Sequence, residues 1–253
     1  MFNKIKSQEQ AYKELKACKN YSELGKFMKR YQKFIAKNSA ADLAKESETY
    51  ARIHHALLGV YKQASYHKCA LQFLEDYADI MIKSFDKKLR PPSQVVSDIV
   101  SFNANLLDQC KTYNHANPYL QYTSLIINLA DKHGLKIDTA PCDRMARFGQ
   151  NMMDQADQYP TAIETSRALN NLAISVANLG RPVEGLDIAK NLNFLREIRP
   201  SAPQKFHDGL DREITRTREV QETYDLIAPK KPAKKEVKQD NTPQGPTIRK
   251  LKR

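Results

Sequence analysis

Apolar side chains recur at intervals of three and four residues along most of this chain, which is the period of an amphipathic α-helix. In the segment YSELGKFMKRYQKFIAKN, for example, Leu24, Met28, Tyr31 and Ile35 fall on one helical face. No segment shows the regular apolar–polar alternation of a β-strand convincingly. The pattern therefore predicts an all-α fold of about ten helices, arranged as antiparallel hairpins.

Prolines, glycines and capping residues mark where these helices are expected to begin and end. One long helix is expected at about 40–64 from its apolar periodicity. Pro118 predicts the start of another helix, and Thr161, with a glutamate three residues later, has the spacing of a capping box. Gly180 suits the left-handed position after a helix end, and Pro182 suits the first position of the next helix.

The positive charge of the chain is concentrated at its C-terminal end. The formal net charge is +12, and residues 229–253 contribute +7 of it. Lysine, proline, glutamine and threonine replace the apolar stripe in this segment, so burial cannot offset the entropy lost on ordering. We therefore predict a helical domain at 1–228 and a disordered basic tail at 229–253. Two clusters of cations in the tail contain Lys230, Lys231, Lys234, Lys235, Arg249, Lys250, Lys252 and Arg253.

The sequence argues against several classes of protein. Its longest apolar runs are much shorter than the roughly 20 residues that cross a bilayer, and no apolar segment of a signal peptide follows the charged N-terminus. The cysteines Cys18, Cys69, Cys110 and Cys142 form no CxxC pair, so we expect buried, reduced thiols rather than a zinc site. No nucleophile, metalloprotease or phosphate-loop motif occurs. We therefore expect a cytoplasmic protein that is not an enzyme and has no metal or cofactor. A nuclear location is expected only if the tail acts as an import signal in a eukaryotic cell.

Residues 166–199 resemble one tetratricopeptide repeat, a unit of two helices that pack through small residues. The positions that carry the resemblance are Leu169, Leu172, Ala173, Val176, Gly180, Gly185, Ala189 and Leu192. The segment departs from the family pattern at Gly185, where alanine is usual, and it lacks the proline at the end of the repeat. Residues 51–84 and a segment from about Leu120 resemble the unit more loosely. The resemblance implies a tetratricopeptide-like solenoid, and an unrelated, irregular helical bundle is the alternative.

The resemblance also implies a set of partner-binding residues, because in that family the first helix of each hairpin lines a groove for an extended peptide. Carried over position by position, the groove would contain Arg52, His55, Lys62, Gln63, Gln121, Ser124, Asn128, Arg167, Asn170, Asn171 and Asn178. Amides can bond a peptide backbone in both directions, and cations can hold a carboxylate. Asn170, Asn171 and Asn178 stand out because asparagine is a weak helix former. The alternative is that these side chains form the ordinary solvated faces of amphipathic helices.

Two functions of different classes are consistent with these features. The first is a non-catalytic adaptor or scaffold that binds a segment of a protein partner in the groove and uses the tail for a second contact. The second is a nucleic-acid-associated protein whose tail neutralises phosphates, without base stacking because the tail has no aromatic residue. For the tail alone, contact with an anionic membrane surface and a purely solubilising role are further alternatives. The sequence leaves the partner and the oligomeric state open.

Overall fold

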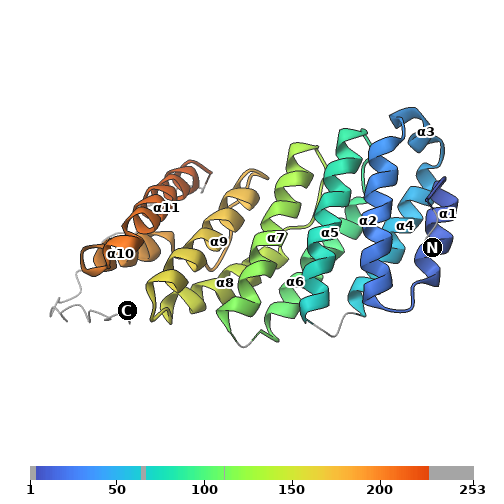
Figure 1. Ribbon diagram of the computed structural model, residues 1–253. Helices are drawn as coiled ribbons and strands as arrows, with labels where there is room; N and C mark the ends of the chain where they lie inside the picture. Colours follow the sequence, from blue (N-terminus) through green and yellow to red (C-terminus); the bar gives the residue numbers. More distant parts are fainter. Residues whose placement is uncertain (1–3, 64–66, 111, 228–253) are drawn as a thin grey trace. The chain divides into compact units, whose positions relative to one another are not determined.

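The computed structural model describes residues 4–63, 67–110 and 112–227. Within these ranges the chain forms eleven α-helices, two short 3-10 helices and no β-strand, which confirms the all-α prediction (Figure 1). None of the helices in these ranges has the length and apolar character needed to cross a membrane. The predicted basic tail lies outside the described residues. The helices are α1 (Gln8–Ala17), α2 (Tyr21–Lys37), α3 (Ala40–Lys45), α4 (Ser47–Lys62), α5 (His67–Asp86), α6 (Ser93–Leu107), α7 (Tyr113–Lys132), α8 (Pro141–Asp154), α9 (Tyr159–Ala177), α10 (Ile188–Ile198), η1 (Arg199–Ser201), η2 (Gln204–Phe206) and α11 (His207–Ile227).

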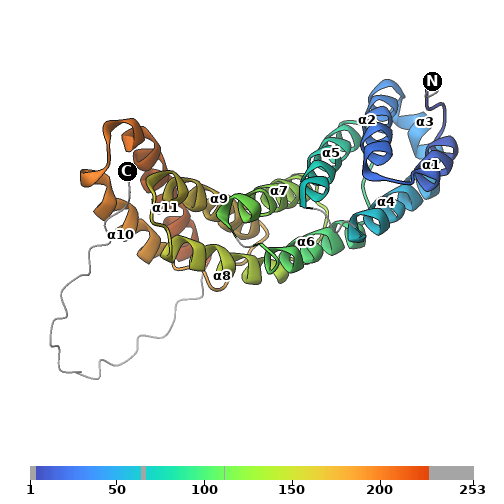
Figure 2. The ribbon, with the colours of Figure 1, turned by 60° about the horizontal axis from the view of Figure 1, so that its bottom comes forward.

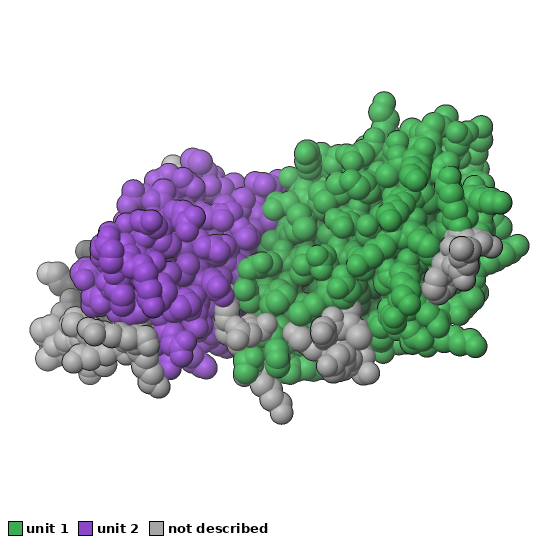
Figure 3. Space-filling model, in the orientation of Figure 1, with its two compact units in different colours: residues 1–145 green, residues 146–253 purple. Residues whose placement is uncertain are grey.

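The contacts within the chain divide it into two compact units, 1–145 and 146–253 (Figure 3). The division falls inside α8, whose first five residues belong to unit 1 and whose remaining residues belong to unit 2. The domain boundary expected at residue 228 lies outside the described residues, which end at residue 227, so it stays a prediction.

Unit 1 is built from two layers of helices. Helices α1, α4 and α6 pack side by side in one layer, and α2, α5 and α7 pack side by side in the other (Figure 2). Successive helices alternate between the layers, apart from the short α3, which packs against α4. Stacked aromatic rings fill the space between the layers. Tyr61 of α4 stacks on Phe73 of α5 with ring centroids 4.4 Å apart, and Phe73 stacks in turn on Tyr77.

Several polar side chains are buried in the same interior and form hydrogen bonds to neighbouring helices, both within one layer and across the two layers. Asn103 of α6 accepts a hydrogen bond from the Tyr61 hydroxyl and donates one to Thr123 of α7 at 2.9 Å. His54 of α4 is fully buried, and its Nδ1 atom lies 2.9 Å from the Tyr77 hydroxyl of α5. These bonds link α4, α6 and α7, and α4 to α5, so they fix the register of helices that apolar contacts alone would leave free to slide.

Unit 2 is organised around α9, whose residues are mostly buried. Helix α9 packs along α11, and α11 also packs against α10. An apolar cluster at one end of these helices includes Met153, Tyr159, Leu169, Leu195 and Leu210. A hydrogen-bonded seam of polar side chains continues the contact between α9 and α11, as described below.

Several of the predicted helix boundaries differ from the structure. The helix expected at 40–64 is broken at Glu46, which follows α3 and precedes α4. Helix α7 begins five residues before Pro118, because Ala116, in its first turns, is fully buried. Helix α9 begins at Tyr159 rather than after Thr161, since a proline in the first helical turn removes an amide that has no partner there.

The predicted Gly-Arg-Pro joint between α9 and α10 is a longer loop than expected. Gly180 does have a left-handed backbone, with φ of 86°. Helix α10, however, begins at Ile188 and not at Pro182, because the Asp187 side chain caps it by accepting a hydrogen bond from the backbone amide of Lys190.

The cysteines are only partly as expected. Cys142 is buried, whereas Cys18 and Cys110 are half-buried, and all three are free thiols. The side chain of Cys69 lies outside the described residues. Burial raises the pKa of the Cys110 thiol to about 11, so this thiol is protonated at neutral pH.

The buried His54 predicts a specific loss of stability in acid. Burial, with a smaller effect of the neighbouring His55, lowers the pKa of His54 to about 3. Below the ordinary histidine pKa the unfolded chain takes up a proton that the folded chain does not, so stability falls as the pH decreases from about 6.5 towards 3. Between about pH 7.5 and about pH 5, we expect His54 to account for a loss of about 2 kcal/mol in the free energy of unfolding.

The measurement is urea denaturation of the wild-type protein and of His54→Gln at both pH values. The substitution changes the absolute stability as well, so the readout is the difference between the two pH values for each protein. A wild-type loss no larger than that of His54→Gln would show that His54 is not held neutral by burial.

A candidate binding groove between α8 and α10

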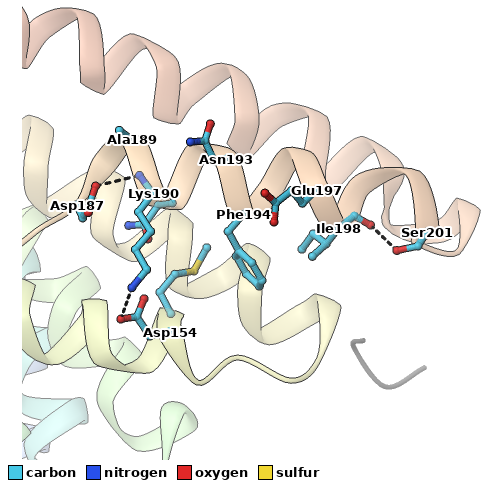
Figure 4. A pocket seen from close by; sticks show the side chains of 11 residues that line it. Asp154, Asp187, Ala189, Lys190, Asn193, Phe194, Glu197, Ile198 and Ser201 are labelled. Carbon is cyan, nitrogen blue, oxygen red and sulfur yellow. Dashed lines mark hydrogen bonds and ion pairs between the residues drawn. The ribbon is translucent and has the colours of Figure 1, made fainter. Parts of the chain in front are cut away.

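Unit 2 contains a hollow between the end of α8 and the exposed side of α10 (Figure 4). It encloses about 550 Å³, within the range of roughly 300–1,000 Å³ that is typical of ligand pockets. We call it the α8–α10 groove. The residues that line it are Met153, Asp154, Asp187, Ala189, Lys190, Asn191, Asn193, Phe194, Glu197, Ile198 and Ser201.

A pair of buried amides holds the two helices of the groove together. The Gln150 side chain of α8 donates to Asn191 Oδ1 of α10 at 2.8 Å and accepts from Asn191 Nδ2 at 3.0 Å. The same side chain also accepts from the backbone amide of Asp187 and donates to Asp154 Oδ1, both at 3.0 Å. Gln150 is 8% exposed, so these bonds form away from bulk water, where leaving them unmade would be costly.

A glycine brings the loop before α10 close to α8. Gly185 has φ of 84°, a left-handed conformation that side chains disfavour. A Cβ atom at this position would lie 2.2 Å from Cγ of Arg147 on α8. This close approach and the left-handed backbone explain why residue 185 is a glycine.

The floor of the groove is apolar and its rim is charged. Met153 and Ile198 are 2% and 5% exposed, and the ring of Phe194 is half-buried and points from α10 into the hollow (Figure 4). At one end, Lys190 Nζ lies 2.7 Å from Asp154 Oδ2. Towards the other end, the Glu197 carboxylate is exposed and forms no ion pair or hydrogen bond with the described residues. Such a surface can take an apolar side chain between charged groups.

The lining of the α8–α10 groove combines apolar, amide, hydroxyl and charged side chains. Neither histidine nor cysteine lines the groove. Among the residues that the structure describes, no group of three or more His, Cys, Asp or Glu side chains could hold a metal ion. The Ser201 hydroxyl donates to the backbone carbonyl of Ile198 at 3.1 Å.

The first group of predicted groove residues lies on α4, where two of its members bond to neighbouring helices. Arg52 lies 3.8 Å from Glu9 of α1, and its guanidinium packs over the Tyr12 ring at 4.2 Å. Lys62 forms an ion pair with Asp98 of α6 at 3.0 Å. The remaining two, His55 and Gln63, are exposed.

The second group lies on α7, which belongs to the other layer of unit 1. Gln121 and Asn128 are exposed. Ser124 is 2% exposed and donates to the backbone carbonyl of Leu120, so its prediction as a groove contact is wrong. Because α4 and α7 are in different layers, the structure does not bring these two groups together on one row of helices. If α4 is the first helix of its hairpin, α7 lies in the layer of the second helices and not in the layer of the first helices.

The third group lies on α9, and its most distinctive member is used inside the protein. Asn170 is 3% exposed and donates to Thr217 at 3.0 Å and to Glu213 at 3.4 Å, both on α11. Its prediction as a partner contact is wrong, because α11 covers it. Arg167 is only partly accessible and forms an ion pair with the buried Glu213 at 3.1 Å. Of the other two, Asn171 is half-buried, and Asn178 is exposed at the end of α9.

The residues that line the α8–α10 groove were not identified from the sequence. One signal was present: at 100° per residue, Phe194 falls about 40° beyond Ile198, at the edge of the apolar stripe formed by Ile188, Leu195 and Ile198. The helix on the other side of the groove, α8, could not be identified in this way. It lies about 40 residues earlier in the chain and is held to α10 by hydrogen bonds between the side-chain amides of Gln150 and Asn191.

The chain was also compared with known proteins. No protein-family model matches it, and neither a curated protein nor a solved structure shows significant similarity to it.

Because Asn170 is buried and Asn178 is exposed, we expect their substitution by alanine to change the stability of the protein by different amounts. Asn170→Ala removes one of the donors to Thr217 and the Asn170 donor to Oε2 of the buried Glu213, which we expect to cost about 1–3 kcal/mol of unfolding free energy. The exposed Asn178→Ala is expected to change stability by less than about 0.5 kcal/mol. Urea denaturation of both variants measures the difference. Equal stabilities would contradict the seam between α9 and α11.

Proposed function

We propose that this protein is a non-catalytic adaptor whose α8–α10 groove binds a short segment of a protein partner. The observation that carries the proposal is the combination of an apolar floor with exposed charges in a hollow of about 550 Å³. Met153, Phe194 and Ile198 form a strip that suits an apolar anchor side chain. The free Glu197 carboxylate beside it suits a lysine or arginine next to that anchor. Recognition of this kind uses one buried anchor and a charged rim.

The rigidity of the groove supports this proposal. Its two helices are held by the reciprocal amide bonds between Gln150 and Asn191, so little ordering is needed when a segment binds. Absence of enzymatic activity, of a metal and of a cofactor is part of the proposal and stays a prediction, as does a cytoplasmic location.

The floor of the groove provides a direct test with a matched control. Phe194 and Phe206 are both partly buried and pack against the same apolar cluster, but only Phe194 lines the groove. Peptide ligands would be selected from a random peptide display library on the immobilised full chain, and their affinities measured by fluorescence polarisation. Phe194→Ala is expected to weaken binding at least about tenfold, because it removes most of an apolar contact of about 1.5–3 kcal/mol. Phe206→Ala is expected to change the affinity by less than about threefold.

Two results would overturn the groove as the binding site. One is an equal loss of affinity in both variants, which would indicate an effect of stability alone. The other is a library selection that yields only peptides whose binding is unaffected by Phe194→Ala.

A second candidate function uses the basic tail, and its net charge of +7 over 25 residues favours it. Here the tail would bind the phosphate backbone of a nucleic acid without sequence preference, by releasing condensed counterions. In the adaptor, the same tail provides the second contact. Binding of the tail to an anionic membrane surface remains a lower-ranked proposal, since the described residues add nothing to it.

The nucleic-acid proposal predicts how affinity depends on salt. With nine basic side chains in the tail, the logarithm of the affinity for a single-stranded oligonucleotide should fall with the logarithm of salt concentration, with a slope as steep as about −6. Fluorescence anisotropy of a labelled oligonucleotide measures this slope for the full chain and for a chain ending at Ile227. The shortened chain should lose most of the affinity and of the slope. If it keeps both, the tail is not the site.

A further inference from the structure

A second hollow, in unit 1, is lined largely by cations. It encloses about 500 Å³ where the segment before α1 meets the C-terminal half of α2. We call it the lysine pocket. The residues that line it are Lys4, Ile5, Lys6, Arg30, Lys33, Phe34, Lys37 and Asn38. No aspartate or glutamate is among these lining residues.

The walls of the lysine pocket are held in place by packing and hydrogen bonds. Ile5 and Phe34 are 3% and 7% exposed and form an apolar floor. Arg30 is only partly accessible, and its Nη1 atom lies 2.7 Å from Glu14 of α1. The backbone amide of Lys6 donates to the Gln10 side chain at 2.9 Å, which ties the segment before α1 to that helix. The pocket is therefore built on fixed elements rather than on a loose loop.

Four of the five cations that line the pocket are exposed lysines without an ion pair among the described residues. Glu14 offsets the charge of Arg30, whereas Lys4, Lys6, Lys33 and Lys37 form no ion pair with any residue that the structure describes. Like charges that converge on one concavity repel each other and raise the positive potential inside it.

Helix electrostatics explain only part of this arrangement. Lys37 lies in the last turn of α2, where the helix dipole favours a cation. Lys4 and Lys6, in contrast, precede the N-terminus of α1, where the dipole disfavours positive charge. Their placement raises the energy of the empty pocket, and a bound anion would lower it.

We propose that the lysine pocket binds a compact organic ligand that carries two phosphate groups. A phosphate monoester carries a charge of about −1.5 to −2 at neutral pH, so two of them match the four lysine charges. The apolar floor of Ile5 and Phe34 suits the carbon frame that joins the phosphates. The volume suits a small molecule rather than a long polymer. The source of this chemistry is either a soluble sugar bisphosphate or the headgroup of a phosphorylated lipid.

This inference is independent of the proposed adaptor function, because the lysine pocket lies in unit 1 and the α8–α10 groove in unit 2. Loss of ligand binding at one site would leave the other unaffected. The two proposals can therefore fail separately.

The test uses the full chain and two double variants that remove the same charge. Lys33→Gln with Lys37→Gln removes two pocket lysines. Lys13→Gln with Lys132→Gln removes two exposed helical lysines elsewhere in unit 1, of which Lys132 lies in the last turn of α7 as Lys37 does in α2. Because the tail is the same in all three proteins, its unspecific attraction for anions cancels in the comparison.

Binding is measured by isothermal titration calorimetry with fructose 1,6-bisphosphate, with inorganic phosphate and with fructose. The wild type and the Lys13/Lys132 control should bind the bisphosphate more tightly than inorganic phosphate and should not bind fructose. The Lys33/Lys37 variant should lose at least about tenfold in affinity, since two charge-assisted contacts are removed. A parallel sedimentation assay uses phosphatidylcholine vesicles with and without phosphatidylinositol bisphosphate.

The two assays distinguish a soluble ligand from a lipid headgroup, and each can also contradict the proposal. Binding of the sugar bisphosphate without vesicle binding indicates a soluble ligand. Vesicle binding that depends on Lys33 and Lys37 indicates a lipid headgroup. The proposal is overturned if neither probe binds, if both double variants lose affinity equally, or if a single-stranded oligonucleotide binds through Lys33 and Lys37 more tightly than the bisphosphate.

Discussion

A polar side chain that is buried between helices needs a partner on the neighbouring helix, and this requirement decides how both units are assembled. In unit 1, Asn103 bonds to Tyr61 of α4 and to Thr123 of α7. In unit 2, Asn170 bonds α9 to α11, and Gln150 bonds α8 to the start of α10 through Asn191. Apolar packing provides most of the attraction between such helices, but it tolerates sliding. The directed bonds select one register.

The same requirement separates side chains that hold the fold from side chains that are free to bind something else. Arg167 and Asn170 have the residue types of a peptide-binding surface, yet both bond to α11. Glu197, at the α8–α10 groove, and the lysines of the lysine pocket have no such bonds with the described residues. The proposed functions therefore rest on the polar groups that internal bonding leaves unused, and these lie on surfaces other than the predicted groove.

Much of the fold could be predicted because its signals are local. The apolar spacing of Leu24, Met28, Tyr31 and Ile35 lies within one helix, α2, and the structure buries all four side chains. Gly180 has the left-handed backbone expected of it. One of the errors arises where packing overrides a local signal. Helix α7 extends past Pro118 towards the N-terminus, where the fully buried Ala116 lies in the first turns.

The sites could not be predicted because they combine segments that are far apart in the sequence. Asn170 and Thr217 are separated by 47 residues, and nothing near Asn170 indicates that α11 covers it. Lys4 and Lys37 come together only because the segment before α1 packs beside the end of α2. A pattern of residue types can identify an exposed or buried face of a helix, but it cannot identify which helix that face will meet.

Amide hydrogen exchange of the full chain, with and without a peptide ligand selected on it, tests the placement of the binding surface most directly. Bound peptide should slow exchange in residues 146–154 of α8 and throughout α10, because the groove is formed by these two helices. Exchange in α4 and α7 should not change. Slower exchange in α4 or α7, with α8 and α10 unaffected, would contradict the placement of the binding surface between α8 and α10.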